Sequence, residues 1–144
     1  MLTNTLNTNE VKNSAGTEQE FTRLSIADRQ TEFALITETP AAPHRLKISH
    51  LETGSGASKR RRSLVRFDKT VTGASLSPVT ISAYAVLDIP VGDIATMAEP
   101  THVLANLISF LASLGASTTI LYDGTGNGQR FCLTAVCKDR LVSF

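Results

Sequence analysis

The side chains of this sequence that most suggest a chemical role are cations. Four basic residues stand together at positions 59–62, and Arg66 follows within an alternating apolar and polar segment. Because successive side chains of a strand point to opposite faces, a strand over residues 62–69 places Arg62 and Arg66 on one face and Val65 and Phe67 on the other. Closely spaced cations neutralise phosphates and release counterions. The segment therefore predicts a strand that presents positive charge to a nucleic acid.

Two further alternating segments add to this face. Residues 44–51 place Arg45, Lys47 and Ser49 together, and residues 80–89 do the same for Ser82 and Tyr84. A tyrosine ring can stack on an unpaired base, and hydroxyls can bond base edges. The competing interpretation is a solvated sheet face whose charges serve solubility. The predicted RNA-binding residues are Arg45, Lys47, Ser49, Arg62, Arg66, Ser82 and Tyr84.

The net charge of +1 hides an uneven distribution. Residues 1–43 carry three basic and six acidic side chains, residues 44–69 carry eight and two, and residues 70–144 carry three and five. The basic centre, and not the near-neutral total, is what indicates a polyanionic partner.

Other kinds of chemistry find little support in the sequence. The three histidines, His44, His50 and His102, show no spacing typical of a catalytic triad, and no paired carboxylates suggest a cleft. The glycines at 124, 126 and 128 lack the lysine of a phosphate-binding loop. Cys132 and Cys137 fit neither a zinc site nor a redox motif. We therefore expect no enzyme, no cofactor and no metal, with the two cysteines either free or linking subunits.

Apolar periodicity predicts one domain of class α+β. An N-terminal hairpin within residues 1–26 is followed by strands at 32–37, 44–51, 62–69 and 80–89, with a long loop over 70–79. Pro100 begins a helix whose apolar residues recur with helical spacing up to Gly115. No run of 18 apolar residues exists, so no membrane partner is expected.

The predicted sheet is too wide for one helix to cover. Five strands span roughly 24 Å, and one helix covers about 10 Å of that width. An interlocked homodimer, in which each subunit lays its helix over the other's sheet, would bury the apolar face.

The order of these elements resembles the coat (capsid) proteins of single-stranded RNA bacteriophages, the levivirus-like family. The resemblance rests on residues 27–30, 45–49, 62–69 and 82–90 together with the helix. It covers roughly residues 1–116, a coat-like sheet-plus-helix domain. The family has a second helix at its end, whereas residues 117–144 form a C-terminal segment of the same domain without a clear pattern.

The resemblance implies a structural protein of the virion, assembled in the cytoplasm of a bacterial host. Its dimers would form an icosahedral shell around single-stranded viral RNA, with the loop over 70–79 near the symmetry axes. In several members the sheet also binds an RNA hairpin and represses translation. The alternative function is a dimeric RNA-binding regulator that does not form shells.

Overall fold

The computed structural model describes residues 3–113 together with residues 121, 123 and 126. These residues form two compact units. The first contains the residues up to Val11 and Gln19–Met97, and the second contains Lys12–Glu18 and the described residues from Ala98 onward. The predictions for residues 117–144, including those for Cys132 and Cys137, lie almost entirely outside the described residues.

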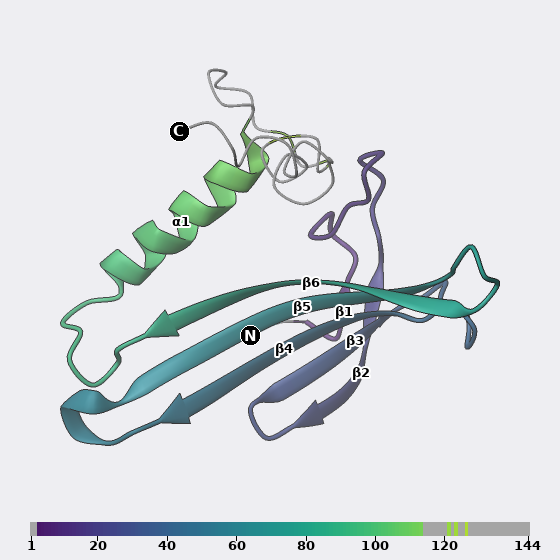
Figure 1. Cartoon of the computed structure of the whole chain (residues 1–144). Helices are drawn as coiled ribbons and strands as arrows, with labels where there is room; N and C mark the ends of the chain where they lie inside the picture. Colours follow the sequence, from purple (N-terminus) through teal and green to yellow (C-terminus); the bar gives the residue numbers. More distant parts are fainter. Residues whose placement is uncertain (1–2, 114–120, 122, 124–125, 127–144) are drawn as a thin grey trace. The chain divides into compact units, whose positions relative to one another are not determined.

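The first unit is a six-stranded antiparallel sheet in which every strand pairs with its neighbour along the chain (Figure 1). The predicted hairpin and meander are confirmed, as is the α+β class with a helix after the sheet. The strands are β1 (Thr5–Leu6), β2 (Phe21–Ala27), β3 (Gln30–Leu35), β4 (His44–Thr53), β5 (Arg60–Thr72) and β6 (Pro78–Ile89).

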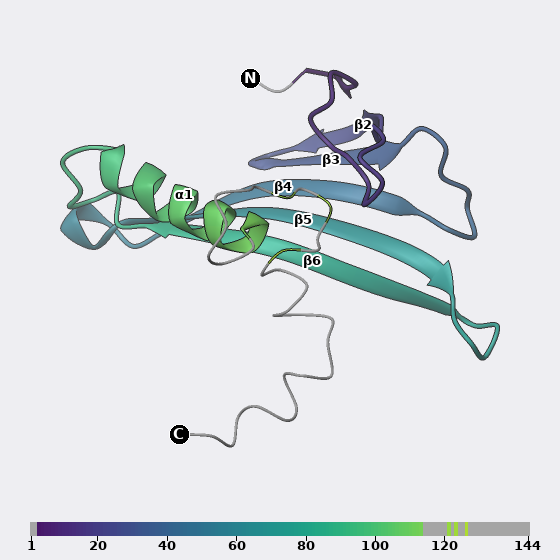
Figure 2. The same ribbon diagram turned by 90° about the horizontal axis from the view of Figure 1, so that it is seen from above.

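The last two strands are longer than predicted. They pair continuously as far as Thr72 and Pro78, so the long loop expected over residues 70–79 is reduced to residues 73–77. Val71 and its threonine neighbours favour extended backbone, and Pro78 is tolerated as the first residue of its strand. Because β4 stops pairing at His44 opposite Lys69, the β5–β6 ribbon extends beyond the other strands (Figure 2).

The core of the first unit lies on one face of the sheet, here called the core face. Its buried residues are Leu6, Phe21, Phe33 and Leu46, and Val11, Leu35, Ile48 and Phe67 pack against them. Alternation explains the selection, because β4 and β5 turn these side chains to the same side. The core is small, and the same face carries exposed apolar side chains on β5 and β6, such as Val65 (42% exposed) and Ile81 (61%).

The second unit contains α1 (Ala98–Ala112). The helix begins two residues before Pro100, the predicted first residue, which is still within the first turn, where the missing N–H is no loss. Val103, Leu107 and Phe110 are all at least 40% exposed. No helix among the described residues is long and apolar enough to cross a membrane.

Close backbone packing fixes the turn that follows β6. The Gly92 N–H donates to the Lys59 carbonyl oxygen at 2.9 Å. A Cβ on Gly92 would lie 2.1 Å from the Gly56 carbonyl oxygen. This approach ties the chain leaving β6 to the β4–β5 connection.

We expect Gly92→Ala to lower the free energy of unfolding by about 1–3 kcal/mol, since the turn must move away from backbone atoms that cannot yield. Denaturant unfolding measures the change. Gly73→Ala is the control, because its Cβ would meet the Val79 side chain at 3.1 Å and the Ser77 carbonyl oxygen at 3.2 Å, contacts that a small shift relieves. Equal losses in both variants would contradict the expectation.

Candidate nucleic-acid interface

The seven predicted RNA-binding residues all lie on the sheet face opposite the core face, here called the polar face. Strand register places them in cross-strand rows. Lys47 faces Arg66, which in turn faces Tyr84. The next row joins Arg45, Asp68 and Ser82. Ser49 lies opposite Leu64, and Arg62 lies between Leu51 and Asp88.

The row of Lys47, Arg66 and Tyr84 combines the groups that a single-stranded nucleic acid requires. Directly opposed side chains on a sheet start about 4.5–5.5 Å apart. Tyr84 is 68% exposed, so its ring is open to a base. A base stacked on this ring would bring its phosphates close to the two cations. Among the described residues, no salt bridge involves Lys47.

Acidic neighbours hold two of the predicted arginines. Arg45 pairs with Glu38 at 2.7 Å and with Glu32 at 3.7 Å. Arg66 Nε donates to Asp68 Oδ1 at 2.8 Å, and its Nη2 donates to Ser82 Oγ at 3.2 Å. Ion pairs exposed to solvent are weak, so a phosphate can replace the carboxylate at Arg66.

The carboxylate of Asp68 organises its corner of the polar face. Hydrogen bonds from Ser82 and Arg66 lower the pKa of Asp68. The carboxylate therefore stays ionised at neutral pH and fixes the direction of the Arg66 guanidinium. Ser82 donates to this carboxylate, so its hydroxyl oxygen keeps accepting capacity for another donor.

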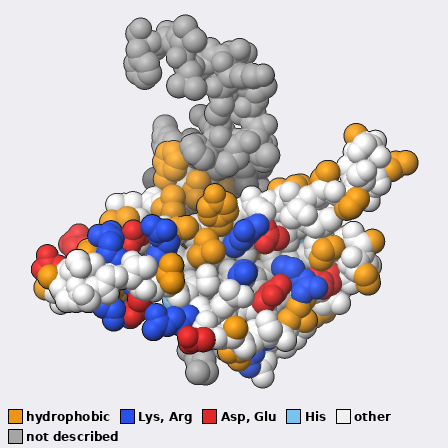
Figure 3. Space-filling model, turned by 60° about the horizontal axis from the view of Figure 1, so that its bottom comes forward, with side chains coloured by type: hydrophobic (Ala, Val, Ile, Leu, Met, Phe, Trp, Pro, Cys, Tyr) orange, Lys and Arg blue, Asp and Glu red, His pale blue; other side chains and the backbone are white. Residues whose placement is uncertain are grey.

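Arg60 belongs to the same face but was not among the predicted residues. Its Nε lies 3.1 Å from Asp88 Oδ1, and Arg62 reaches the other oxygen of that carboxylate at 3.7 Å. The expected strand began at Arg62, although parity alone would have placed Arg60 beside it. Basic and acidic side chains alternate on the surface of the sheet, with hydrophobic side chains between them (Figure 3).

Comparison with solved structures gives several matches to this fold. The coat protein of bacteriophage EMS014 matches with a TM-score of 0.60 and 12% identity, over 81% of this chain and 79% of that one. The virus-like particle of Beihai levi-like virus 32 matches with a TM-score of 0.52 and 26% identity, over 63% and 74%. The chain has the fold of a levi-like phage coat protein. No protein-family model and no curated protein matches the sequence.

The coat-protein fold agrees with the expectation of a structural protein and not an enzyme. Within the part of the chain that is described, no group of three or more His, Cys, Asp or Glu side chains is arranged to hold a metal ion. Of the histidines, His50 bonds Ser63 through Nδ1 at 2.8 Å, and His44 packs against the core.

His44 sits in an aromatic setting on the core face of the coat-protein fold. Its ring lies 5.2 Å from that of Phe21 and 6.5 Å from that of Phe67, and its buried Nδ1 has no hydrogen-bond partner. Burial lowers the pKa of His44, the positive charge of Lys69 lowers it further, and Glu38 opposes the shift.

The folded protein therefore resists protonation of His44, whereas the unfolded chain accepts the proton near the usual pKa. The stabilising contribution is complete above about pH 6.5 and is lost as the pH falls towards the lowered pKa of the folded state. We expect His44→Phe to lose less thermal stability than the wild type between pH 7 and pH 5. A thermal unfolding series across this range measures the effect, and parallel curves would contradict it.

Proposed function

We propose that this chain is a capsid protein that assembles from dimers into an icosahedral shell and packages single-stranded RNA. The observation that carries the proposal is a polar face bearing Arg45, Lys47, Arg62, Arg66 and Tyr84 on a coat-protein fold. Structural neighbours described as virus-like particles support the shell. The protein would then belong to the virion and assemble in the cytoplasm of a bacterial host.

The surfaces left open by a single copy support a homodimer. The core face exposes Val65 and Ile81, and α1 exposes Val103 and Phe110. β6 is an edge strand of twelve residues, so its outer backbone groups are free to pair with another strand. An interlocked dimer, with α1 of each copy on the other copy's core face, removes this apolar surface from water.

The ribbon tip offers a second place for contacts between copies. Leu76 is 86% exposed and adopts a left-handed backbone with φ of 60°. A non-glycine residue in that conformation costs free energy, which the surrounding turn must offset. In the proposed shell, this leucine would contact a neighbouring dimer near a symmetry axis.

RNA would lie along the polar face, held by cations and by stacking on Tyr84. Binding would be strongly salt-dependent, because each phosphate contact releases counterions. Recognition of a hairpin in the viral RNA, with repression of translation, would use Ser49 and Ser82 at base edges. The alternative function, a dimeric RNA-binding regulator that forms no shell, uses the same face.

Expression followed by electron microscopy and measurement of nucleic-acid content tests the proposal. Uniform closed shells that contain RNA are the expected result. Soluble dimers that bind RNA but never close into shells would favour the regulator. Shells without RNA would retain the structural role and reject the assignment of the polar face.

A further inference from the structure

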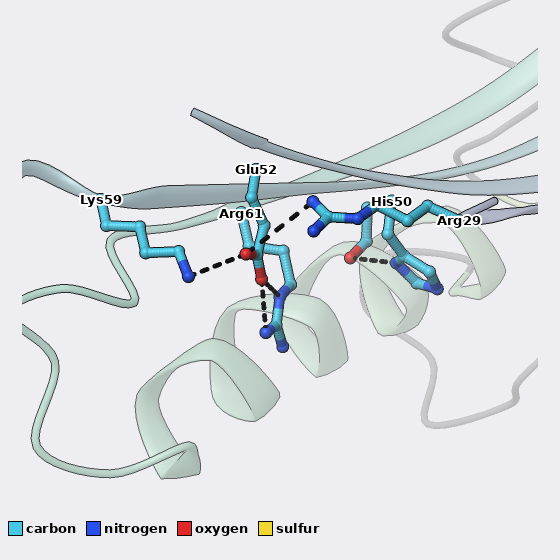
Figure 4. Close-up of polar contacts among 6 residues, drawn as sticks. Arg29, His50, Glu52, Lys59 and Arg61 are labelled. Atoms are coloured by element: carbon cyan, nitrogen blue, oxygen red, sulfur yellow. Dashed lines mark hydrogen bonds and ion pairs between the residues drawn. The ribbon is translucent and has the colours of Figure 1, made fainter. Parts of the chain in front are cut away.

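Three cations meet one carboxylate on the core face, at the β4–β5 end of the sheet (Figure 4). Lys59 Nζ lies 2.8 Å from Glu52 Oε2, and Arg29 Nη1 lies 3.8 Å from the same oxygen. Arg61 donates to Oε1 from both Nε, at 2.8 Å, and Nη2, at 2.6 Å. This cluster of Arg29, Glu52, Lys59 and Arg61, the Glu52 cluster, lies on the side of the sheet away from the polar face.

The Glu52 cluster carries two positive charges in excess. Hydrogen bonds from Lys59 and Arg61 lower the pKa of Glu52 to about 2, so the carboxylate is ionised at every physiological pH. It can balance only one of the three cations. The side chains of Arg29, Lys59 and Arg61 remain 51%, 43% and 44% exposed, so each keeps donors free for another acceptor.

A hollow of about 460 Å³ adjoins the cluster. Arg29, His50, Arg61 and Ser63 supply polar groups to its wall, while Leu87 and Ile89 give it an apolar side. Apart from Glu52, the charged side chains of this wall are cations. The hollow thus offers donors in excess of acceptors, the composition that suits an oxyanion.

The backbone of Arg29 is fixed in an unusual conformation that serves this arrangement. Its φ is 57°, in the left-handed region that few non-glycine residues adopt. The Arg29 carbonyl oxygen accepts the His50 N–H at 2.8 Å, which pins the β2–β3 turn beside β4. Strained residues of this kind cluster at binding sites, where the surrounding structure holds them in place.

We propose that the Glu52 cluster is a binding site for a phosphate group, on the face of the sheet opposite the RNA-binding face. Two guanidinium groups and an ammonium group converge there, and guanidinium matches phosphate geometry with paired hydrogen bonds. The phosphate comes either from a free phosphate ion or from the backbone of an RNA strand that reaches this end of the sheet. The site does not depend on shell formation.

Thermal unfolding of the full-length protein in phosphate and in chloride, at equal ionic strength and pH, tests the site. Inorganic phosphate is expected to raise the Tm with saturation, as a ligand of the folded state does. The double variant Arg29→Gln/Arg61→Gln is expected to weaken the apparent affinity by about tenfold or more. Arg60→Gln is the matched control, because Arg60 is the adjacent residue and pairs with a carboxylate on the opposite face.

A second series with the dinucleotide UpU separates the two sources of phosphate. Stabilisation by UpU that the double variant loses and Arg60→Gln retains supports the RNA backbone as ligand. Stabilisation by inorganic phosphate alone supports the free ion. Equal Tm values in phosphate and chloride, or an equal loss in Arg60→Gln and the double variant, would overturn the site while leaving the RNA role of the polar face intact.

Discussion

Phe33→Ala is expected to lower the free energy of unfolding by about 3–5 kcal/mol. The Phe33 ring is fully buried, and it shares the core with only three other buried residues, Leu6, Phe21 and Leu46. Removing the ring leaves a cavity on the core face that the rigid pairing of β3 with β2 and β4 cannot collapse. A loss of this size is a large part of the stability of an ordinary domain, so much of the variant should be unfolded at moderate temperature.

Denaturant unfolding followed by circular dichroism measures this loss. Leu76→Ala is the control, since Leu76 is 86% exposed at the ribbon tip and should change stability little. If Leu76→Ala instead prevented shell formation without lowering stability, the ribbon tip would be identified as a contact between dimers. Similar stability of Phe33→Ala and the wild type would mean that the core lies elsewhere.

The double variant Lys47→Ala/Arg66→Ala is expected to lose most of the RNA that the wild-type protein packages. These two cations are cross-strand neighbours in the row that ends at Tyr84. If each contacts one phosphate, the slope of log K against log salt should fall by about two for a flexible single strand. Filter binding across a salt series gives the slope, and the absorbance ratio of purified particles gives the RNA content.

Lys69→Ala is the matched control for the charge on the polar face. Lys69 lies on β5 opposite His44 and Ile81, and so on the core face. Its removal changes the net charge as Lys47→Ala does but leaves the polar face intact. If Lys69→Ala and Lys47→Ala reduced RNA binding equally, overall charge and not the polar face would govern packaging.

The faces of the strands could be predicted from the sequence because a strand alternates with a period of two. Once residues 62–69 are extended, the separation of Arg66 from Phe67 follows, and the register of β4, β5 and β6 agrees with it. Strand ends were harder to predict. Arg60, Val71 and Pro78 all extend strands beyond the predicted limits because pairing with a neighbouring strand, and not local preference, decides where a ladder stops.

The ionic partners of the cations could not be predicted from alternation. Glu38 reaches Arg45 from a connecting segment, and Arg29 reaches Glu52 from a different hairpin. Such contacts depend on how turns direct long side chains. The one accessible signal for the Glu52 cluster was the basic run after the β4–β5 connection, facing Glu52 once β4 is extended to Thr53.

The strictly sequential order of the strands has a consequence for how the protein forms. Each of β2 to β6 pairs with the strand that was synthesised just before it, so every pairing closes a short loop. Folds of low contact order form quickly, since little chain entropy is lost before each contact is made. The sheet can therefore grow hairpin by hairpin during translation, and β6 is added last. We expect folding of each copy to be fast and independent of concentration, and the meeting of two copies to set the pace of assembly.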